Sequence, residues 1–252
     1  MHKVYSALLV LGPVLSGPAV SQADDQADMQ ALLDKATRAL GGRTNLAKFN
    51  GLTTNGKGKI HVGNELSFTQ EGYWQLPGKY RVDMNLDLMG NAISEKIILN
   101  SDKGWIKVQD QVVKMPKDTF TAFRDVFHAI HLAMRPLDAK GKGFQVSPLG
   151  ELKIGDKPAI GVKITRKGYP DVDLYLDKKP GLPVQSEIRG KDDMGGKEVA
   201  HTLLFSDYKK FGDLKSYTKF LWKKDGKKYV EIEITELKHE EKLDADLFAK
   251  PQ

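Results

Sequence analysis

The sequence predicts a mainly β fold with helices, of the α+β class, in which about eleven antiparallel strands form a sandwich or barrel. After Leu52 the apolar side chains alternate with polar ones, which is the pattern of half-buried antiparallel strands. Turn sequences separate these runs, and Asp225-Gly226 is the clearest of them, because a tight hairpin turn needs residues with positive φ. A helical period of three to four residues is limited to two longer segments.

The first 23 residues have the pattern of a cleavable signal peptide. A basic start, Met1-His2-Lys3, precedes a mostly apolar run from Val4 to Val20 and a small-residue end at Ser21-Gln22-Ala23. Glycine and proline interrupt the run, whereas a membrane-spanning helix needs about 20 unbroken apolar residues. A retained anchor is the alternative. We therefore predict a signal peptide over residues 1–23 and a single domain over residues 24–252, located in the periplasm or otherwise outside the cytoplasm.

The composition restricts the chemistry of the mature chain. The absence of cysteine excludes disulfides, a thiol nucleophile, a thiolate metal site and lipid attachment through an N-terminal cysteine. The formal net charge is +6, and many lysines occur in adjacent pairs, which solvated turns and edge protection explain. An anionic membrane surface is the alternative partner for these lysines. Nucleic acid is not an expected partner, because the chain lacks a basic helix. We expect a soluble monomer.

The predicted elements follow one another in the order helix, about six strands, helix, about five strands. The segment from Asp24 to Leu40 has one apolar stripe and ends at Gly41-Gly42, which supplies a left-handed stop. A short helical turn is expected around Leu46-Phe49. The clearest strand runs from Lys79 to Met89. One face of that strand is apolar and comprises Tyr80, Val82, Met84, Leu86 and Leu88.

The central helix is expected between Pro116-Lys117-Asp118 and Arg135-Pro136, since a proline disfavours helix in the residue before it. Its apolar face is rich in phenylalanine and comprises Phe120, Phe123, Phe127, Ile130 and Met134. A barrel of about eleven strands is too wide for its own side chains to fill, because about eight strands already leave room for a ligand. The helix would therefore either cover an apolar ligand as a lid or complete a dry core, and the sequence leaves both open.

Catalytic and metal-binding patterns are sparse. The sequence contains no nucleophile elbow, phosphate-binding loop or zinc-protease motif. His128 and His131 are spaced to share a metal on a helix, with Asp125 nearby, but a third ligand is not apparent. Asp192-Asp193 precede Gly195-Gly196 and are interpreted as solvated turn residues. We therefore expect binding rather than enzymatic activity, with no cofactor and no metal.

The order of these elements and several short motifs resemble the LolA/LolB-like superfamily of periplasmic lipoprotein carriers. The matching residues are Leu33-Asp34-Lys35-Ala36, Ala39-Leu40-Gly41-Gly42, Leu46-Ala47, Leu52-Thr53, Leu149-Gly150-Glu151, Gly161-Val162, Tyr175-Leu176-Asp177, Gly181-Leu182-Pro183-Val184, Asp207-Tyr208, Asp225-Gly226-Lys227, Leu243-Asp244-Ala245-Asp246-Leu247-Phe248 and Pro251. They span essentially the whole mature chain. The resemblance implies a half-open antiparallel β-barrel of about eleven strands, with an apolar cavity under a helical lid that shelters acyl chains. The arginine that holds the lid of the dedicated carrier has no counterpart that we can place here.

These observations lead to the hypothesis of an exported carrier that binds lipid acyl chains or another apolar ligand, in lipid or lipoprotein trafficking across the cell envelope. The expected ligand-binding residues are Phe120, Phe123, Phe127, Ile130 and Met134 from the helix, with Tyr80, Met84, Leu86 and Leu88 from the sheet. A membrane protein of the envelope or an anionic membrane surface is a further expected partner. The alternative hypothesis is a non-catalytic envelope scaffold whose barrel is filled by its own side chains.

Overall fold

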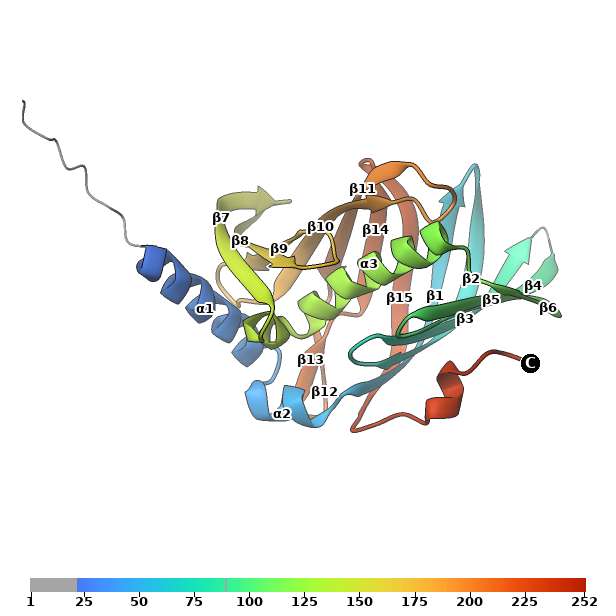
Figure 1. The fold of residues 1–252 in the computed structure, drawn as a ribbon, viewed down its shortest axis with the longest axis horizontal. Coiled ribbons are helices and arrows are strands. Elements are labelled where there is room, and N and C mark those ends of the chain that lie inside the picture. The colour runs from blue at the N-terminus through green and yellow to red at the C-terminus, as the bar shows by residue number, and fades with distance from the viewer. Residues whose placement is uncertain (1–21, 89) are drawn as a thin grey trace, which may run out of the picture.

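The computed structural model describes residues 22–88 and 90–252 (Figure 1). The predicted signal peptide lies outside these residues except for Gln22 and Ala23, which form the start of the first helix. The helices within the described residues are α1 (Gln22–Ala39), α2 (Arg43–Lys48) and α3 (Lys117–Met134), with the short 3-10 turns η1 (Pro136–Lys140) and η2 (Ala245–Phe248). None of these helices is long and apolar enough to cross a membrane.

Within residues 22–88 and 90–116, six strands precede α3, as expected. They are β1 (Gly51–Val62), β2 (Asn64–Gln75), β3 (Lys79–Leu88), β4 (Asn91–Asn100), β5 (Lys103–Val108) and β6 (Gln111–Lys114). Those that follow are β7 (Phe144–Ile154), β8 (Lys157–Arg166), β9 (Val172–Asp177), β10 (Pro183–Lys191), β11 (Glu198–Ser206), β12 (Lys209–Phe211), β13 (Leu214–Ser216), β14 (Lys219–Lys224) and β15 (Lys227–Glu240).

The prediction of about eleven strands was too low. Nine strands follow α3 within the described residues, where about five were expected. β12 and β13 have three residues each, which is too short for an alternating pattern to appear. β7 leaves most of its side chains exposed and therefore lacks the alternation of a half-buried strand.

A single antiparallel sheet of thirteen strands contains all of these except β12 and β13, which form a separate ribbon. Its order is β6-β5-β4-β3-β2-β1-β15-β14-β11-β10-β9-β8-β7, so β6 and β7 are its two edges and the sheet does not close. The mainly β architecture with helices is thus confirmed. At the edge, β7 pairs with β8 through a register that shifts between Pro148 and Gly150.

The β14–β15 hairpin has the turn that its sequence predicts. Asp225 and Gly226 have φ angles of 46° and 77°, both in the left-handed region that a type I′ turn requires. This turn fixes how β14 and β15 pair, and it places Phe220 opposite Ile232 and Trp222 opposite Val230. All four side chains belong to the sheet face that packs against α3.

Helix α3 runs across the concave side of the curved sheet (Figure 1). It begins directly after Pro116 and ends before Arg135, as the flanking prolines predict. Arg135 fixes this end of the helix: one of its terminal nitrogens donates a 2.6 Å hydrogen bond to Asn50 Oδ1, and its Nε lies 3.2 Å from Asp138 Oδ2. Every side chain from Asp125 to Ala133 is buried, because the sheet curves around the helix.

The two terminal segments cover other parts of the sheet. Leu33 and Ala36 of α1 are fully buried in the main core. At the other end of the chain, Leu243 and Phe248 pack on Ile98, on the face of the sheet that points away from α3. The segment Leu243–Phe248, which carries one of the motifs noted above, therefore closes the outer side of β3 and β4.

A candidate ligand-binding cavity beneath helix α3

An apolar cavity of about 400 Å³ lies between α3 and the concave face of the sheet. This volume falls within the range of small-molecule sites in proteins, roughly 300–1,000 Å³. Most of its wall comes from β1, β2, β3, β4, β14 and β15, with α3 as its cover. The helix contributes Thr119, Phe123, Val126, Phe127, Ile130 and Met134.

Strand alternation explains which side chains reach the cavity. Every second residue of a strand points to the same face, so Val230, Ile232 and Ile234 of β15 all line the cavity, whereas Glu231 and Glu233 lie on the opposite face. Glycine at the inward position of β1 adds room. A Cβ atom on Gly58 would stand only 2.5 Å from Cζ of Phe68, so glycine lets that ring lie against the strand.

The structure brings five of the nine predicted ligand-binding residues together in the lining. They are Phe123, Phe127, Ile130 and Met134 of α3 and Met84 of β3. The other four lie outside the lining. Phe120 packs against Gly104 and Met115, and Tyr80 is buried behind Phe127, with its ring centroid 5.0 Å from that of Phe127. Leu86 and Leu88 lie toward the β3–β4 hairpin, where Leu88 is 39% exposed.

Sequence reasoning missed several lining residues, including the aromatic side chains Trp74, Trp222 and Tyr229 and the acidic side chain Glu95. The alternation of β15 was visible, but a single strand pattern does not reveal which sheet face will carry a helix. Glu95 did give a signal. It occupies an inward position of β4, two residues before the buried Ile97, where an apolar residue is the rule.

The loop between β10 and β11 supplies a polar group at one end of the cavity. Asp193 was interpreted as a solvated turn residue, yet its side chain is only 5% exposed. It is bonded by Lys224 Nζ and accepts a 2.6 Å hydrogen bond from the hydroxyl of Tyr229. The interpretation failed because the loop folds back over β14 and β15, where two partners compensate the buried carboxylate. Burial and this carboxylate raise the pKa of the Tyr229 phenol above its ordinary value.

The metal hypothesis for the helix histidines is not supported. His131 Nε2 lies 2.7 Å from Asp138 Oδ2, and Arg124 donates hydrogen bonds to Asp125. Within residues 22–88 and 90–252, no group of three or more histidine, aspartate or glutamate side chains is placed to hold a metal ion. His131 and Asp125 thus have partners within the protein. His128 is buried as well.

Acidification is expected to destabilise the fold through His128. Its ring packs 4.2 Å from that of Tyr169, centroid to centroid, and burial lowers its pKa from 6.5 to about 3. Because the folded pKa is the lower one, the unfolded chain binds the proton first, and stability falls as the pH drops below about 6.5. The charged or titratable groups facing it are His131, Arg166 and Arg124.

From His128 alone, we expect the free energy of unfolding to be about 2 kcal/mol lower at about pH 5 than at about pH 7.5. Urea unfolding at the two pH values measures this difference. His128→Phe keeps an aromatic ring between Phe144 and Tyr169 and should lose this part of the pH dependence. If the free energy of unfolding of His128→Phe fell by the same amount between the two pH values, His128 would not be the cause of the pH dependence. The difference between the variant and the natural protein at the higher pH measures the effect of the substitution on packing.

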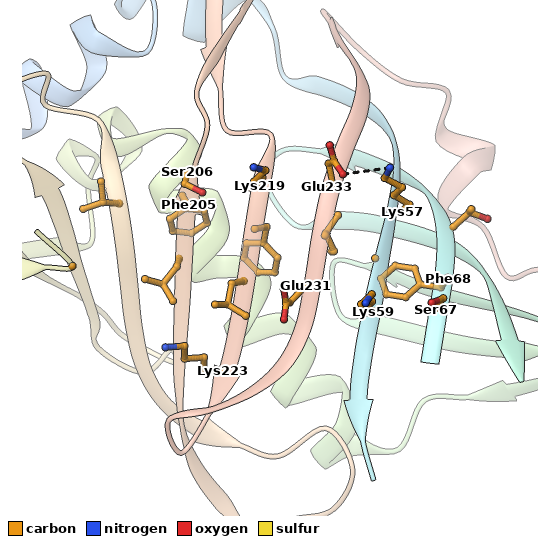
Figure 2. A pocket seen from close by; sticks show the side chains of 18 of the residues that line it. Lys57, Lys59, Ser67, Phe68, Phe205, Ser206, Lys219, Lys223, Glu231 and Glu233 are labelled. Atoms are coloured by element: carbon orange, nitrogen blue, oxygen red, sulfur yellow. Dashed lines mark ion pairs between the residues drawn. The ribbon is translucent and has the colours of Figure 1, made fainter. Parts of the chain in front are cut away.

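A second, broader hollow of about 1050 Å³ lies on the opposite face of the same sheet (Figure 2). Lysine and glutamate side chains form part of its lining, and Lys57 Nζ lies 3.5 Å from Glu233 Oε2. Apolar side chains such as Leu204 and Leu221 also line this hollow, but no helix within the described residues covers it, and its charged groups favour hydration over an apolar guest. The cavity beneath α3 is therefore the better candidate site.

Comparison with known proteins places the fold. No protein-family model matches the sequence, and no curated protein matches it. Among solved structures, a DUF1329 family protein from Desulfovibrio piger superposes with a TM-score of 0.57 at 15% identity, covering 88% of this chain and 97% of that one. A putative outer membrane lipoprotein-sorting protein domain from Vibrio parahaemolyticus gives 0.56 at 12% identity, again with 88% and 97% coverage.

A LolA superfamily protein from Nitrosomonas europaea gives the same values, with a TM-score of 0.56, 12% identity, and coverage of 88% of this chain and 97% of that one. At such identities the likeness concerns the fold. The match extends over nearly the whole of each solved chain, so it includes the open antiparallel sheet and the helix across it. The chain therefore has the LolA-like fold, as its resemblance to that superfamily predicts.

Proposed function

We propose that the protein is an exported carrier that shelters a lipid acyl chain, or another apolar molecule, in the cavity beneath α3. The observation that supports this most directly is the cavity itself. It is lined mainly by aliphatic and aromatic side chains, and a flexible methionine stands on each side of it, Met84 on the sheet and Met134 on the helix. Methionine adapts to irregular apolar surfaces, which suits a chain that can bend in several ways.

Burial of apolar surface would provide the binding energy. Each methylene removed from water contributes about 0.8 kcal/mol, so a sixteen-carbon chain would gain on the order of 10 kcal/mol before ordering costs are subtracted. The open cavity favours this role over that of a scaffold whose barrel is filled by its own side chains. In the proposed carrier, residues 1–23 direct export to the periplasm, and a membrane protein or anionic membrane surface there delivers or accepts the ligand.

Lipid extraction tests the proposal. Protein purified from its native host without detergent and extracted with organic solvent should yield about one lipid molecule per chain by mass spectrometry, because the apolar cavity retains its guest. The stripped protein should then bind a neutral fluorescent probe, with a spectral shift typical of an apolar site. Absence of both stoichiometric lipid and probe binding would rule out a carrier. Light scattering of the same sample tests the expected monomer.

A further inference from the structure

The cavity has an uneven distribution of charge, which bears on the head group of its ligand. Among the described residues that line it, the only charged side chains are Glu95 and Asp193, and lysine, arginine and histidine are absent. Both acids belong to the same end of the cavity, because the carboxylate of Asp193 acts on Glu95 and both act on the phenol of Tyr229. The opposite end, at Leu52, Trp74 and Met134, is apolar.

The cation that contacts Asp193 is already engaged. Lys224 is 13% exposed and bonds Asp193, and its Nζ also donates a 2.7 Å hydrogen bond to Asp192 Oδ1. The ammonium group further stacks on the ring of Tyr229, 3.4 Å from the centroid. Two carboxylates and one ring thus share a single positive charge, which leaves none for a ligand.

Glu95, by contrast, has no hydrogen-bond or ion-pair partner within the described residues. It faces the cavity from β4, opposite Met84 in the strand register. Burial, and after it the charge of Asp193, raise the pKa of its carboxyl group. An acceptor in this position gains most from a ligand group that donates a hydrogen bond, and it repels a second anion.

The N-terminus of α3 reaches this end of the cavity at Thr119. It does not make the net charge at this end positive. A helix N-terminus is equivalent to about half a positive charge. The first turn of α3 contains Lys117 and Asp118, whose charges cancel, and Glu95 and Asp193 add two negative charges to the cavity lining. The polar end of the cavity therefore remains acidic.

Building on the proposed function, we infer that the cavity selects amphiphiles with an uncharged or cationic head group and discriminates against fatty-acid and phosphate anions. The apolar chain fills the space between α3 and the sheet, and a hydroxyl, amide or amine head group donates a hydrogen bond to Glu95. The hydroxyl of Thr119 and the amide of Gln70 lie in the same lining and offer further polar contacts. A carboxylate there would be buried without a cation, which is costly.

Displacement of a bound neutral probe, N-phenyl-1-naphthylamine, tests this at neutral pH. Dodecanol, dodecylamine and dodecanoate carry the same chain and differ only in the head group. We expect the Kd of dodecanoate to be at least about tenfold higher than those of the other two, which corresponds to a difference in binding free energy of about 1.4 kcal/mol. The chain as a whole has a formal charge of +6 and would attract the anion, so this order reports the local charge of the cavity.

Glu95→Gln should bring dodecanoate to within about threefold of dodecanol, because the unpaired charge is gone. Glu233→Gln is the matched control, since Glu233 stands on the opposite face of the same sheet and faces the other hollow (Figure 2). It should leave the tenfold gap intact.

The outcomes separate the two proposals. Equal binding of the three amphiphiles by the natural protein would overturn the selectivity and leave the carrier standing, and this comparison does not depend on how any variant folds. A gap that persists in Glu95→Gln would remove Glu95 as its cause and overturn the inference. Failure of the probe and of all three amphiphiles to bind would overturn the carrier itself.

Discussion

Replacing Met84 by tryptophan is expected to weaken the binding of a neutral apolar probe by at least about tenfold while the fold persists. Met84 is half-buried and lines the cavity from the middle of β3, with α3 on the other side of the open space. The indole would occupy volume that a ligand needs, and the cavity already holds room for it, so little strain results. Fluorescence titration measures the affinity, and thermal unfolding monitors the fold.

The neighbouring residue, Asn85, provides a control, because tryptophan at this position adds the same side chain on the opposite face of the sheet. Asn85 is exposed, lines the charged hollow and points away from α3. Asn85→Trp should therefore leave probe binding within about twofold of the natural protein. If Asn85→Trp abolished binding and Met84→Trp did not, the hollow on the outer face would be the binding site. If both left it unchanged, neither cavity would hold the probe.

Phe127→Ala is expected to lower the free energy of unfolding by about 3 kcal/mol, at the lower end of the cost of deleting a buried phenylalanine. The ring of Phe127 packs edge-on against Trp74, with centroids 5.2 Å apart, and near those of Tyr80 and Phe123. It therefore couples the helix to β2 and β3. Its loss should also enlarge the cavity, so bulkier apolar probes should gain affinity relative to small ones.

Urea unfolding of Phe127→Ala and Phe120→Ala compares two phenylalanines on the same face of α3. Phe120 is only half-buried and lies outside the cavity, so its replacement should cost clearly less, about 1–2 kcal/mol. Equal losses would show that Phe127 does not couple the helix to the sheet more strongly than Phe120 does. The melting curves also reveal whether each variant remains cooperative.

Short sequence motifs predicted the elements whose bounds depend on neighbouring residues in the sequence. Flanking prolines set both ends of α3, and Asp225-Gly226 set the β14–β15 turn, because each restricts the backbone within a few residues. The alternation from Lys79 to Met89 predicted β3, which ends at Leu88, and Val82 and Met84 of its predicted apolar face line the cavity. The order of such elements along the chain then sufficed to recognise the fold.

The features that the sequence did not predict, the cavity lining and the burial of Asp193, depend on contacts between residues that are far apart in the sequence. Phe120 and Phe127 belong to one helical stripe, yet only Phe127 faces the cavity, because the curvature of the sheet decides where the helix and the strands separate. Asp193 lies 31 residues from Lys224 and 36 residues from Tyr229 in sequence, so its burial depends on how the β10–β11 loop folds over two later strands. The pattern of a single segment of sequence does not reveal such long-range contacts.

The two edges of the open sheet have a consequence for how this chain behaves at high concentration. A thirteen-stranded sheet that does not close presents unpaired backbone groups at both ends, where strands of other molecules could add. β6 is only four residues long and ends in a lysine, and β7 carries a proline, which has no amide hydrogen, at the position where its register shifts. Both edges are therefore poor templates, and the sheet can stay open to a guest without recruiting copies of itself into fibres.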